Sequence, residues 1–344
     1  MVSVNRAELH SILLRHIQAK FDTIGGGGRL FTGKKLVSIS EVSKESAKMT
    51  FQDGTTAIAD LVIAADGIRS AVRRQFSADE PVYGNKIIYR GLIPFSSLPN
   101  PWPLNSHAAM WIAIGAHFLM YPISADKTIN VIACKDKQLT DIGADLSSER
   151  WFATCDRSEL EGDFAEFTDP LVQEVMRLMP REISKWRLND RRPIESWVFM
   201  GGKVVLLGDA AHPMVPHQSA GAGQAVEDGY ILAKALGWFL LLKGDASGEQ
   251  STEPEISKEK LAKENNALER WITLYQNVRM PRAARTQESS RKAGELFELI
   301  EPEMEGLSYE ERLPSLREQA LENTKWIWTE DIDAAWEKAL SEMV

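Results

Sequence analysis

Two runs of consecutive apolar residues each end in a turn that contains an aspartate, and this arrangement constrains the fold more than any other feature. Residues 61–65 read Leu-Val-Ile-Ala-Ala before Asp66-Gly67, and residues 204–207 read Val-Val-Leu-Leu before Gly208-Asp209. A helix is predicted after each turn. An apolar strand without alternation, followed by a turn and a helix, is typical of a buried parallel strand. We therefore predict that both strands lie in one parallel α/β sheet.

Between these strands the pattern changes to short strands separated by Pro, Gly and Asn, which indicates an antiparallel sheet. The short strands are predicted at residues 87–89, 109–112, 117–121 and 129–132. Residues 147–180 are predicted to be helical, with apolar spacing that fits a helix at 171–179.

The remaining segments are mostly predicted helices. Residues 6–20 are predicted to form an amphipathic helix with apolar Leu9, Ile12, Leu13 and Ile17. Strands are predicted at 36–39 and 48–51, and residues 52–55, directly after the second of these strands, carry a hairpin turn signal. A helix follows residue 220 and runs to about residue 242, and residues 244–254 are predicted to be a polar loop. Residues 258–299 form a long helical region that Pro281 should kink or restart. Trp326, Trp328 and Trp336 are expected to pack as amphipathic anchors.

Composition narrows the class of protein. The net charge of −9 disfavours nucleic acid as a partner, because an acidic surface repels phosphates. Cys134 and Cys155 match no metal motif, so we expect reduced thiols, no metal site and a cytoplasmic location. Residues 1–6 do not resemble a signal peptide, and the apolar stretch 231–242 is too short to cross a bilayer.

The segment that follows the second apolar strand has the chemistry of a ligand site. Asp209 is predicted at the carboxyl edge of the sheet, where open α/β sheets bind ligands, and could accept hydrogen bonds from a polyol. Small residues such as Gly208 and Ala210 allow a ligand to approach the backbone. Residues 216–225 open a helix whose free N–H groups could stabilise an anion. The alternative is a tight strand-to-helix connection in which Asp209 only caps a turn.

Three ordered motifs resemble those of the single-component FAD-dependent aromatic-ring monooxygenases of the salicylate-hydroxylase type. The second FAD motif of this family is resembled by residues 208–213 (Gly-Asp-Ala-Ala-His-Pro) together with residues 221–228 (Gly-Ala-Gly-Gln-Ala-Val-Glu-Asp). Residues 60–73 resemble its Asp-Gly motif. Residues 5–10 resemble its arginine-bearing helix start. Residues 89–91 and 278–282 also fit this family. The motifs together are far more specific than any one of them.

The resemblance implies a role for individual residues toward FAD. Asp209, followed by Ala210, would hydrogen-bond the ribityl chain, and Pro216 would lie beside the isoalloxazine near the reacting position. Arg6 would reach the ribityl–pyrophosphate region. The backbone of Gly221, Ala222 and Gly223 would meet the flavin pyrimidine, and Asp66 and Gly67 would lie near the phosphates of FAD and the nicotinamide cofactor.

Four further residues leave two interpretations open. His212 could touch the cofactor or a proton path, or it could be a structural residue of a tight turn. Arg90 could pair with a substrate carboxylate or hold a domain interface. His107 and His117 could face an aromatic acid or simply pack in the predicted sheet.

The activity implied by the resemblance is FAD- and NAD(P)H-dependent hydroxylation of a phenolic or aromatic-acid substrate by O₂, through a flavin C4a-hydroperoxide, with no separate NAD(P)H domain. One alternative is a flavoprotein monooxygenase of secondary metabolism that acts on a polyketide-like phenol. Another is an inactive homologue, because the family begins with a strand, Gly-x-Gly-x-x-Gly and a helix, and nothing before Arg6 supplies them. The glycine run 25–28 follows a helix and reads as a connector, so we expect an N-terminally truncated chain.

The expected fold is α/β, with an incomplete Rossmann-like FAD-binding domain, an inserted antiparallel substrate domain and a C-terminal helical segment. The FAD-binding domain would comprise residues 1–80 and 186–245, the antiparallel β-sheet substrate domain residues 81–185, and the helical region residues 246–344. The expected partners are a small aromatic substrate and O₂. A homodimer is compatible with the sequence, which leaves the oligomeric state open.

Overall fold

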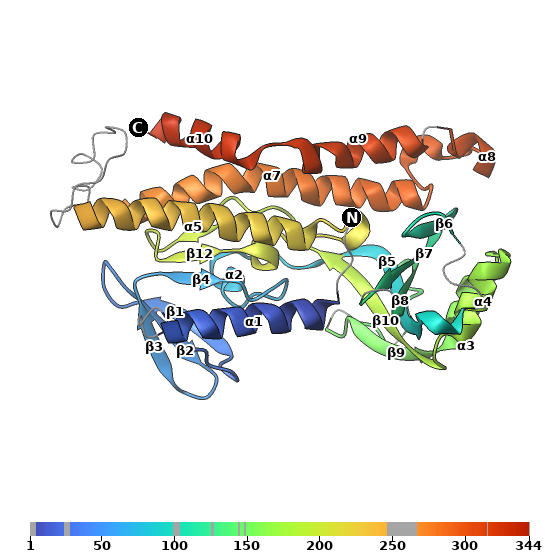
Figure 1. Cartoon of the computed structure of the whole chain (residues 1–344), viewed down its shortest axis with the longest axis horizontal. Coiled ribbons are helices and arrows are strands. Elements are labelled where there is room, and N and C mark those ends of the chain that lie inside the picture. Colours follow the sequence, from blue (N-terminus) through green and yellow to red (C-terminus); the bar gives the residue numbers. More distant parts are fainter. Residues whose placement is uncertain are drawn as a thin grey trace. The chain divides into compact units, whose positions relative to one another are not determined.

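A computed structural model describes residues 5–23, 28–98, 104–124, 127–143, 145–147, 149–245, 267–314 and 316–343 of the chain (Figure 1). The chain divides into two compact units. The first unit comprises Met1–Gly33, Tyr83–Leu188 and Glu295–Leu316, and the second comprises Lys34–Val82, Asn189–Gly294 and Arg317–Val344. Residues 25–27 of the predicted glycine connector 25–28 lie outside the described residues. The segment 246–266, with most of the predicted polar loop and the predicted helix start at 258, also lies outside them.

The two apolar strands of the second unit are neighbours in one sheet, as predicted. β4 (Val62–Ala64) runs parallel to β12 (Val204–Leu206), and β11 (Val198–Phe199) pairs with β12 in the antiparallel sense. β12 is buried throughout, whereas Ile63 in the middle of β4 is 45% exposed. The prediction of burial on both faces is therefore wrong for β4, because only one face of this edge strand is covered by described residues.

Helices of the second unit cover the other face of this sheet (Figure 1). α5 (Gly221–Asp245), α7 (Ala267–Phe297) and α10 (Ile332–Met343) all contribute to one apolar core with β4 and β12. Buried side chains of this core include Val205, Leu206, Ile231, Ile272 and Trp336. Burial of side chains of this size contributes about 1.5–3 kcal/mol each, which holds the short sheet against the helices.

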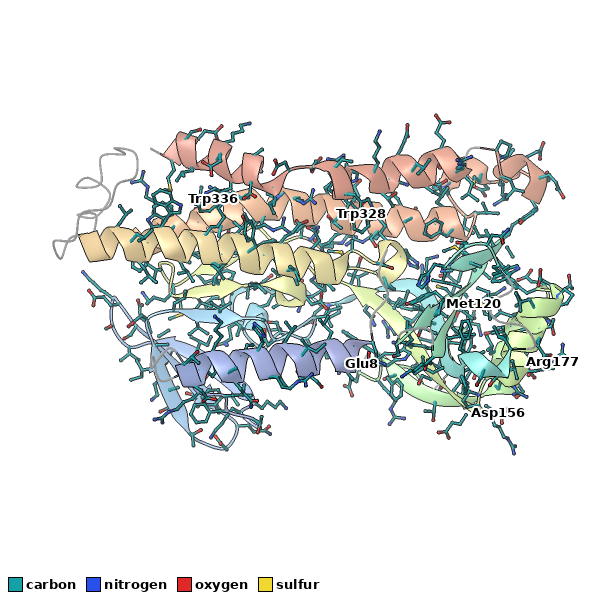
Figure 2. All side chains as sticks on the ribbon, in the orientation of Figure 1. Glu8, Met120, Asp156, Arg177, Trp328 and Trp336 are labelled. Atoms are coloured by element: carbon teal, nitrogen blue, oxygen red, sulfur yellow. The ribbon has the colours of Figure 1, made fainter. Side chains whose placement is uncertain are left out.

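The helical end agrees only in part with the predictions that Pro281 kinks or restarts the helix and that three tryptophans are anchors. α7 continues through Pro281 without a restart, although proline removes one backbone donor from the helix. Of the three predicted tryptophan anchors, Trp336 is fully buried and Trp326 is nearly so, but Trp328 of α9 (Leu316–Thr329) is 65% exposed (Figure 2). Trp326 and Trp328 are two positions apart, so they point to different sides of the helix and only one can face the core.

A small antiparallel sheet completes the second unit. β1 (Leu36–Glu41), β2 (Ala47–Phe51) and β3 (Thr56–Ala59) pair in that order. The predicted turn between β2 and β3 is closed by a hydrogen bond from the Phe51 N–H to the Thr55 carbonyl, at 2.9 Å. Gly54 has a φ of +80°, a conformation that favours glycine. The short helix α2 (Arg73–Phe76) follows β4.

The first unit contains a six-stranded sheet with the order β6-β7-β8-β5-β10-β9. Its strands are β5 (Val82–Pro94), β6 (Ala109–Ala113), β7 (Ala116–Ile123), β8 (Thr128–Asp136), β9 (Phe152–Asp156) and β10 (Glu182–Asp190). The four predicted short strands are confirmed as β5 to β8. One face packs against α3 (Arg157–Asp163) and α4 (Pro170–Leu178), and Figure 2 labels Met120 in this core.

The prediction of a helix throughout residues 147–180 is wrong at its start. Phe152–Asp156 form the strand β9, which pairs with β10 in the register Cys155↔Ile183. The partner strand lies almost thirty residues away, so local periodicity does not reveal the pairing. Helices follow where aspartates cap them: Asp156 accepts from the Ser158 N–H, and Asp169 accepts from the Leu171 N–H.

The N-terminal helix forms as predicted, but its apolar side is not covered by described residues. α1 (Arg6–Thr23) is capped by Asn5, whose side chain accepts a hydrogen bond from the Ala7 N–H at 2.9 Å. Leu9, Ile12, Leu13 and Ile17 are between 41% and 53% exposed. Among the described helices of both units, none combines the length and the apolar character that a bilayer span requires.

A buried charged cluster ties the end of α7 to the sheet of the first unit. Glu298 is fully buried, and its carboxylate contacts the ammonium of Lys86 on β5 and lies 3.3 Å from Nδ1 of His117 on β7. Burial by itself would raise the pKa of Glu298, but the contacts with His117 and Lys86 outweigh it and lower the pKa from 4.5 to about 2. The chain then forms two short helices, η4 (Pro302–Met304) and α8 (Tyr309–Arg312).

We expect Glu298→Gln to lower the free energy of unfolding by about 3–5 kcal/mol, because it leaves the Lys86 ammonium buried without its counter-charge. Urea denaturation at pH 7 measures this loss. The exposed Glu303→Gln on the same segment is the control and should change stability by less than about 0.5 kcal/mol.

The same variant should change the pH dependence of stability. A carboxyl group with a lowered folded-state pKa stabilises the fold above its unfolded pKa, and this contribution is lost as the pH falls through the folded-state value. Between pH 4.5 and pH 2, the wild-type chain should therefore lose more stability than Glu298→Gln. Equal acid sensitivity of the two proteins would contradict this account of the cluster.

Candidate functional site

The two aspartate-bearing turns lie at one edge of the parallel sheet in the second unit. The Asp66-Gly67 turn follows β4, and Gly208-Asp209 follows β12, its parallel neighbour. The backbone bond from the Leu207 N–H to the Ala64 carbonyl, at 3.0 Å, extends this pairing to the ends of both strands. The carboxyl ends of neighbouring parallel strands meet at the same edge, which is where open α/β sheets bind ligands.

Gly208 begins a 3₁₀ turn, η2 (Gly208–Ala210), that packs directly against α5. Its φ is +61°, and a methyl group added to it would lie 3.2 Å from Cβ of Ala225. Glycine is therefore required both by the backbone conformation and by the close approach of the helix. Ala210 is fully buried, whereas Asp209 between them is exposed at the sheet edge.

A buried carboxylate beneath this turn holds it in place. Asp228 of α5 is fully buried and accepts hydrogen bonds from the Gly208 N–H at 2.9 Å, from Nε2 of His212 at 2.5 Å and from Nε of Arg279 at 2.8 Å. Burial would raise the pKa of Asp228, but the contacts with His212 and Arg279 lower it below its usual value.

This arrangement bears on the two interpretations of His212. Its side chain is only 1% exposed, its Nε2 is engaged by Asp228, and its ring lies 5.1 Å from that of Trp197. The imidazole thus joins the turn after β12 to α5. The geometry favours the structural interpretation of His212 over a direct contact with a ligand.

Asp66 is used within its own turn. Its Oδ2 accepts hydrogen bonds from the N–H groups of Ala71 at 2.7 Å and Val72 at 3.3 Å. Gly67 has a φ of +79°, and a methyl group added to it would meet no atom within 4 Å. The turn is thus rigidified by Asp66, and Gly67 leaves open space for a group that approaches the backbone.

Two buried arginines connect the turns, and the sequence alone did not single them out. Arg73 forms a two-point ion pair with Asp79, and its Nη1 donates to the carbonyl of Ala211 at 2.6 Å. Arg191 donates to Asp79 at 2.8 Å and to the Ile68 carbonyl at 3.1 Å. The Asp79 carboxylate therefore fixes the backbone on both sides of the candidate site through two guanidinium groups.

The loop that contains Pro216 is held by buried polar side chains of α7. Gln287 donates to the Pro213 carbonyl at 2.8 Å, and Ser290 donates to the Val215 carbonyl at 2.6 Å. Ser289 donates to the side chain of Gln218 at 2.9 Å, at the end of η3 (Pro216–Gln218). We call Gln287, Ser289 and Ser290 the α7 clamp. Pro216 itself is exposed.

The start of α5 offers backbone hydrogen-bond donors. The first N–H groups of a helix have no partner within the helix and carry partial positive charge. The first intrahelical bond here runs from Gln224 to the Ala220 carbonyl, so those groups belong to Gly221, Ala222 and Gly223. A methyl group added to Gly223 would meet nothing within 4 Å. The carboxylate of Asp209 and the backbone donors of this helix start fit the ribityl hydroxyl groups of FAD and the hydrogen-bond acceptors of its pyrimidine ring.

Arg6 and Arg90 belong to the first unit, where they line one cleft of about 590 Å³ with Tyr121 and Asn130. His117 contacts Glu298 in the same unit, as described above. In the second unit, the ring of His217 packs against Gly294. A methyl group added to Gly294 would lie 2.5 Å from Cδ2 of His217. The predicted site residues therefore fall into two groups, one in each unit.

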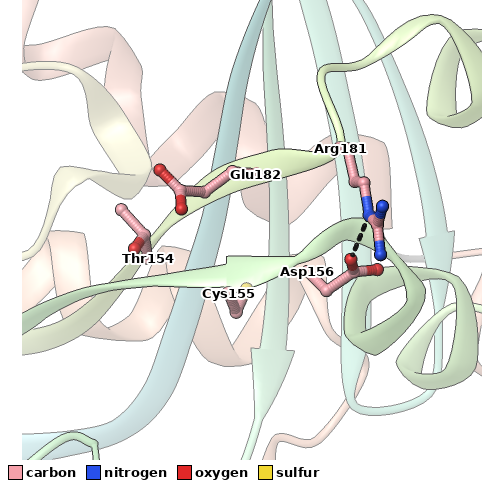
Figure 3. A pocket seen from close by; sticks show the side chains of 5 residues that line it. All are labelled: Thr154, Cys155, Asp156, Arg181 and Glu182. Carbon is pink, nitrogen blue, oxygen red and sulfur yellow. Dashed lines mark hydrogen bonds and ion pairs between the residues drawn. The ribbon is translucent and has the colours of Figure 1, made fainter.

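A second cleft of the first unit, between β9 and β10, has little capacity for chemistry (Figure 3). Its arginine, Arg181, is already paired with Asp156 at 3.0 Å. Burial raises the pKa of the Cys155 thiol to about 11, so this group is protonated and a poor nucleophile at neutral pH. We therefore do not assign the reaction to this cleft.

We expect Asp228→Asn to lower the free energy of unfolding by about 3 kcal/mol, because the buried guanidinium of Arg279 and the Gly208 turn lose their shared carboxylate. Urea denaturation measures the change. Glu288→Gln on α7, whose side chain is 65% exposed, is the control and should be close to neutral. A neutral Asp228→Asn variant would show that this carboxylate does not hold the turn.

We expect Ser290→Ala to accelerate amide hydrogen exchange in residues 216–224, because the loop loses one bond of the α7 clamp, with a stability cost of about 1 kcal/mol. Hydrogen-exchange mass spectrometry makes the comparison. Thr286→Val is the matched control, since this buried hydroxyl donates only within α7, to the Arg282 carbonyl. If both variants altered the loop equally, the clamp would have no specific role.

Comparison with known proteins agrees with this geometry. The sequence model of the family described as "FAD binding domain" matches residues 8–255. The chain is 30% identical to the FAD-dependent monooxygenase sor5 of Hypocrea jecorina, over 99% of this chain and 73% of that protein. It is 28% identical to a salicylate hydroxylase of Pseudomonas putida, over 96% of this chain and 70% of that protein.

A solved structure of a salicylate hydroxylase substrate complex superposes with a TM-score of 0.72 at 28% identity, covering 97% of this chain and 75% of that one. The α/β fold with an antiparallel sheet and a helical C-terminal segment is thus the fold of this group. The family match extends over more than half of the chain and includes the Asp66-Gly67 turn, the Gly208-Asp209 turn and the start of α5. The chain therefore belongs to the FAD-binding-domain family of FAD-dependent aromatic-ring monooxygenases.

Proposed function

We propose that the chain binds FAD at the carboxyl edge of the parallel sheet and hydroxylates a phenolic or aromatic-acid substrate with O₂. The observation that carries this proposal is the packing of the Gly208-Asp209 turn against the start of α5. It presents an exposed carboxylate next to a helix N-terminus without side-chain bulk. These are the two features that an FAD ribityl chain and pyrimidine ring would need.

In this proposal the chain's own residues bind FAD and fix its orientation. Asp209 accepts hydrogen bonds from ribityl hydroxyls, and the backbone of Gly221, Ala222 and Gly223 faces the pyrimidine. The Asp66-Gly67 turn borders the phosphates. Ala210 supports the turn from the buried side. Such fixed dipoles stabilise charge without reorganisation at the moment of reaction.

The Pro216 loop would form one wall beside the flavin ring. The α7 clamp holds this loop through the carbonyls of Pro213 and Val215. A rigid wall excludes water, and water exclusion favours transfer of oxygen to the substrate over loss of hydrogen peroxide. When bound, FAD supplies the electron transfer from NADH or NADPH to O₂ that this hydroxylation requires.

The substrate class is proposed from the relatives. One of them is named as a salicylate hydroxylase, which favours an aromatic acid. A larger phenol of secondary metabolism is the alternative, and the fungal FAD-dependent monooxygenase sor5 is the relative that favours it. Oxidation of NADH or NADPH by the chain with FAD, measured with salicylate and with larger phenols, separates the two.

We expect Asp209→Asn to weaken FAD binding by about 10- to 150-fold, because it replaces charge-assisted hydrogen bonds worth about 1.5–3 kcal/mol. Quenching of flavin fluorescence on titration of the chain into FAD measures the dissociation constant. Glu45→Gln, an exposed acid of the same unit, should bind FAD like the wild type. Absence of FAD binding by the wild-type chain would contradict the proposed function itself.

A further inference from the structure

The strand β9 forms one edge of the six-stranded sheet in the first unit. β10 is its one partner among the described strands, and their register runs from Phe152↔Trp186 to Asp156↔Glu182 without a shift. The strand is thus regular over its whole length, with no bulge, no proline and no lysine to obstruct a further strand. Such features are how proteins usually protect an exposed edge, so the bare edge of β9 is a template for backbone pairing.

The hydrogen bonds to β10 show which backbone groups are left at this edge. The Arg157 N–H donates to the Arg181 carbonyl at 2.7 Å, and the Arg187 N–H donates to the Trp151 carbonyl at 2.9 Å. The odd-numbered residues of β9 are therefore the ones in hydrogen-bonded pairs with β10, because such pairs alternate along an antiparallel ladder. Thr154 lies between two of them, so its N–H and carbonyl point away from β10.

The opposite edge of the same sheet is covered, whereas β9 is not. Tyr309 of α8 donates from its hydroxyl to the Ile112 carbonyl of β6 at 3.1 Å, and every residue of β6 is half-buried. At β9, no hydrogen bond from another described element reaches the backbone of Thr154. Phe152 and Trp186 are each 42% exposed, with ring centroids 4.6 Å apart. An exposed aromatic pair beside a free edge is typical of a surface that another chain covers.

The two ends of β9 are complementary to each other. Phe152 and Trp186 give one end an aromatic surface. Asp156 and Arg181 give the other end an ion pair of 3.0 Å, whose arginine side chain is 92% exposed (Figure 3). A twofold axis through Thr154 would place Phe152 of one copy opposite Asp156 of a second copy. The guanidinium of Arg181 would then lie beside an aromatic ring, where cation–π attraction is favourable.

We propose that two copies of the chain pair their β9 strands in the antiparallel sense, with Thr154 on the twofold axis. The two Thr154 residues exchange both backbone hydrogen bonds, which satisfies the groups left at the edge. Each strand covers the edge of the other, so the pairing closes at a dimer. The partner is a second copy of this chain because the aromatic end and the charged end of one strand match each other when the strand is reversed.

Sedimentation velocity of the full chain over a series of concentrations measures the dissociation constant of the dimer. Thr154→Lys places two like charges on the axis, and we expect it to raise this constant at least about 10-fold. Ser97→Lys is the matched control, because Ser97 is an exposed residue of the same unit, in the 3₁₀ turn η1 (Phe95–Ser97) after β5. It should leave the constant unchanged. Circular dichroism verifies that both variants are folded.

A cross-link tests the register independently. The Cα atoms of a hydrogen-bonded antiparallel pair are about 5.5 Å apart, within the range that a disulfide spans. Under mild oxidation, Thr154→Cys should therefore form a covalent dimer on non-reducing electrophoresis, whereas Ser97→Cys should not exceed the wild-type level.

The proposal is overturned if the wild-type chain remains monomeric at every concentration or forms assemblies larger than a dimer. It is also overturned if the two lysine variants dimerise equally, or if Thr154→Cys cross-links no more than Ser97→Cys. These measurements need neither FAD nor turnover, so their failure leaves the FAD titration of Asp209→Asn interpretable.

Discussion

The geometry of the candidate flavin site depends on one buried carboxylate, Asp228. A charge in an apolar core costs several kcal/mol unless its partners are all in place. Asp228 meets this condition only when three elements are assembled together. α5 carries the carboxylate, the turn after β12 supplies Gly208 and His212 as partners, and α7 supplies Arg279. The backbone turn that carries the exposed Asp209 is positioned by this buried network.

A second carboxylate that is shared by basic side chains lies near the site. The Asp79 carboxylate is shared by Arg73 and Arg191, and these guanidinium groups reach backbone carbonyls on both aspartate turns. Tyr275 of α7 donates to the Leu206 carbonyl at 3.0 Å, at the end of β12. Long polar side chains that reach a buried carbonyl replace the regular hydrogen bonds that a turn cannot make for itself. The ligand-facing backbone is thereby preorganised, which is the main contribution that a protein makes to cofactor chemistry.

In the first unit, the alternation of the strands places core side chains on one face of the sheet and charged and polar side chains on the other. On one face of β5, Ile87, Tyr89 and Ile93 are fully buried in the core with α3 and α4. On the other face the same strand carries Lys86 toward Glu298 and Arg90 toward Asn130. A single strand therefore anchors the end of α7 at one point and presents a donor-rich surface at another. Successive side chains of a strand point to opposite faces, so core packing and these polar contacts do not compete for space.

The sequence by itself determined the elements whose signal is local. Unbroken apolar runs before Asp66 and Gly208 predicted the parallel pair β4 and β12, and the spacing of small residues predicted the start of α5. The three FAD motifs, by resemblance, indicated the family. Only the tertiary structure decided which partners these elements have. It made residues 152–156 a strand, left Trp328 exposed, and engaged His212 with Asp228. Periodicity reports the conformation of a segment and which side of it is apolar, but pairing, burial and charge compensation depend on residues distant in the chain, and these meet only when the chain is folded.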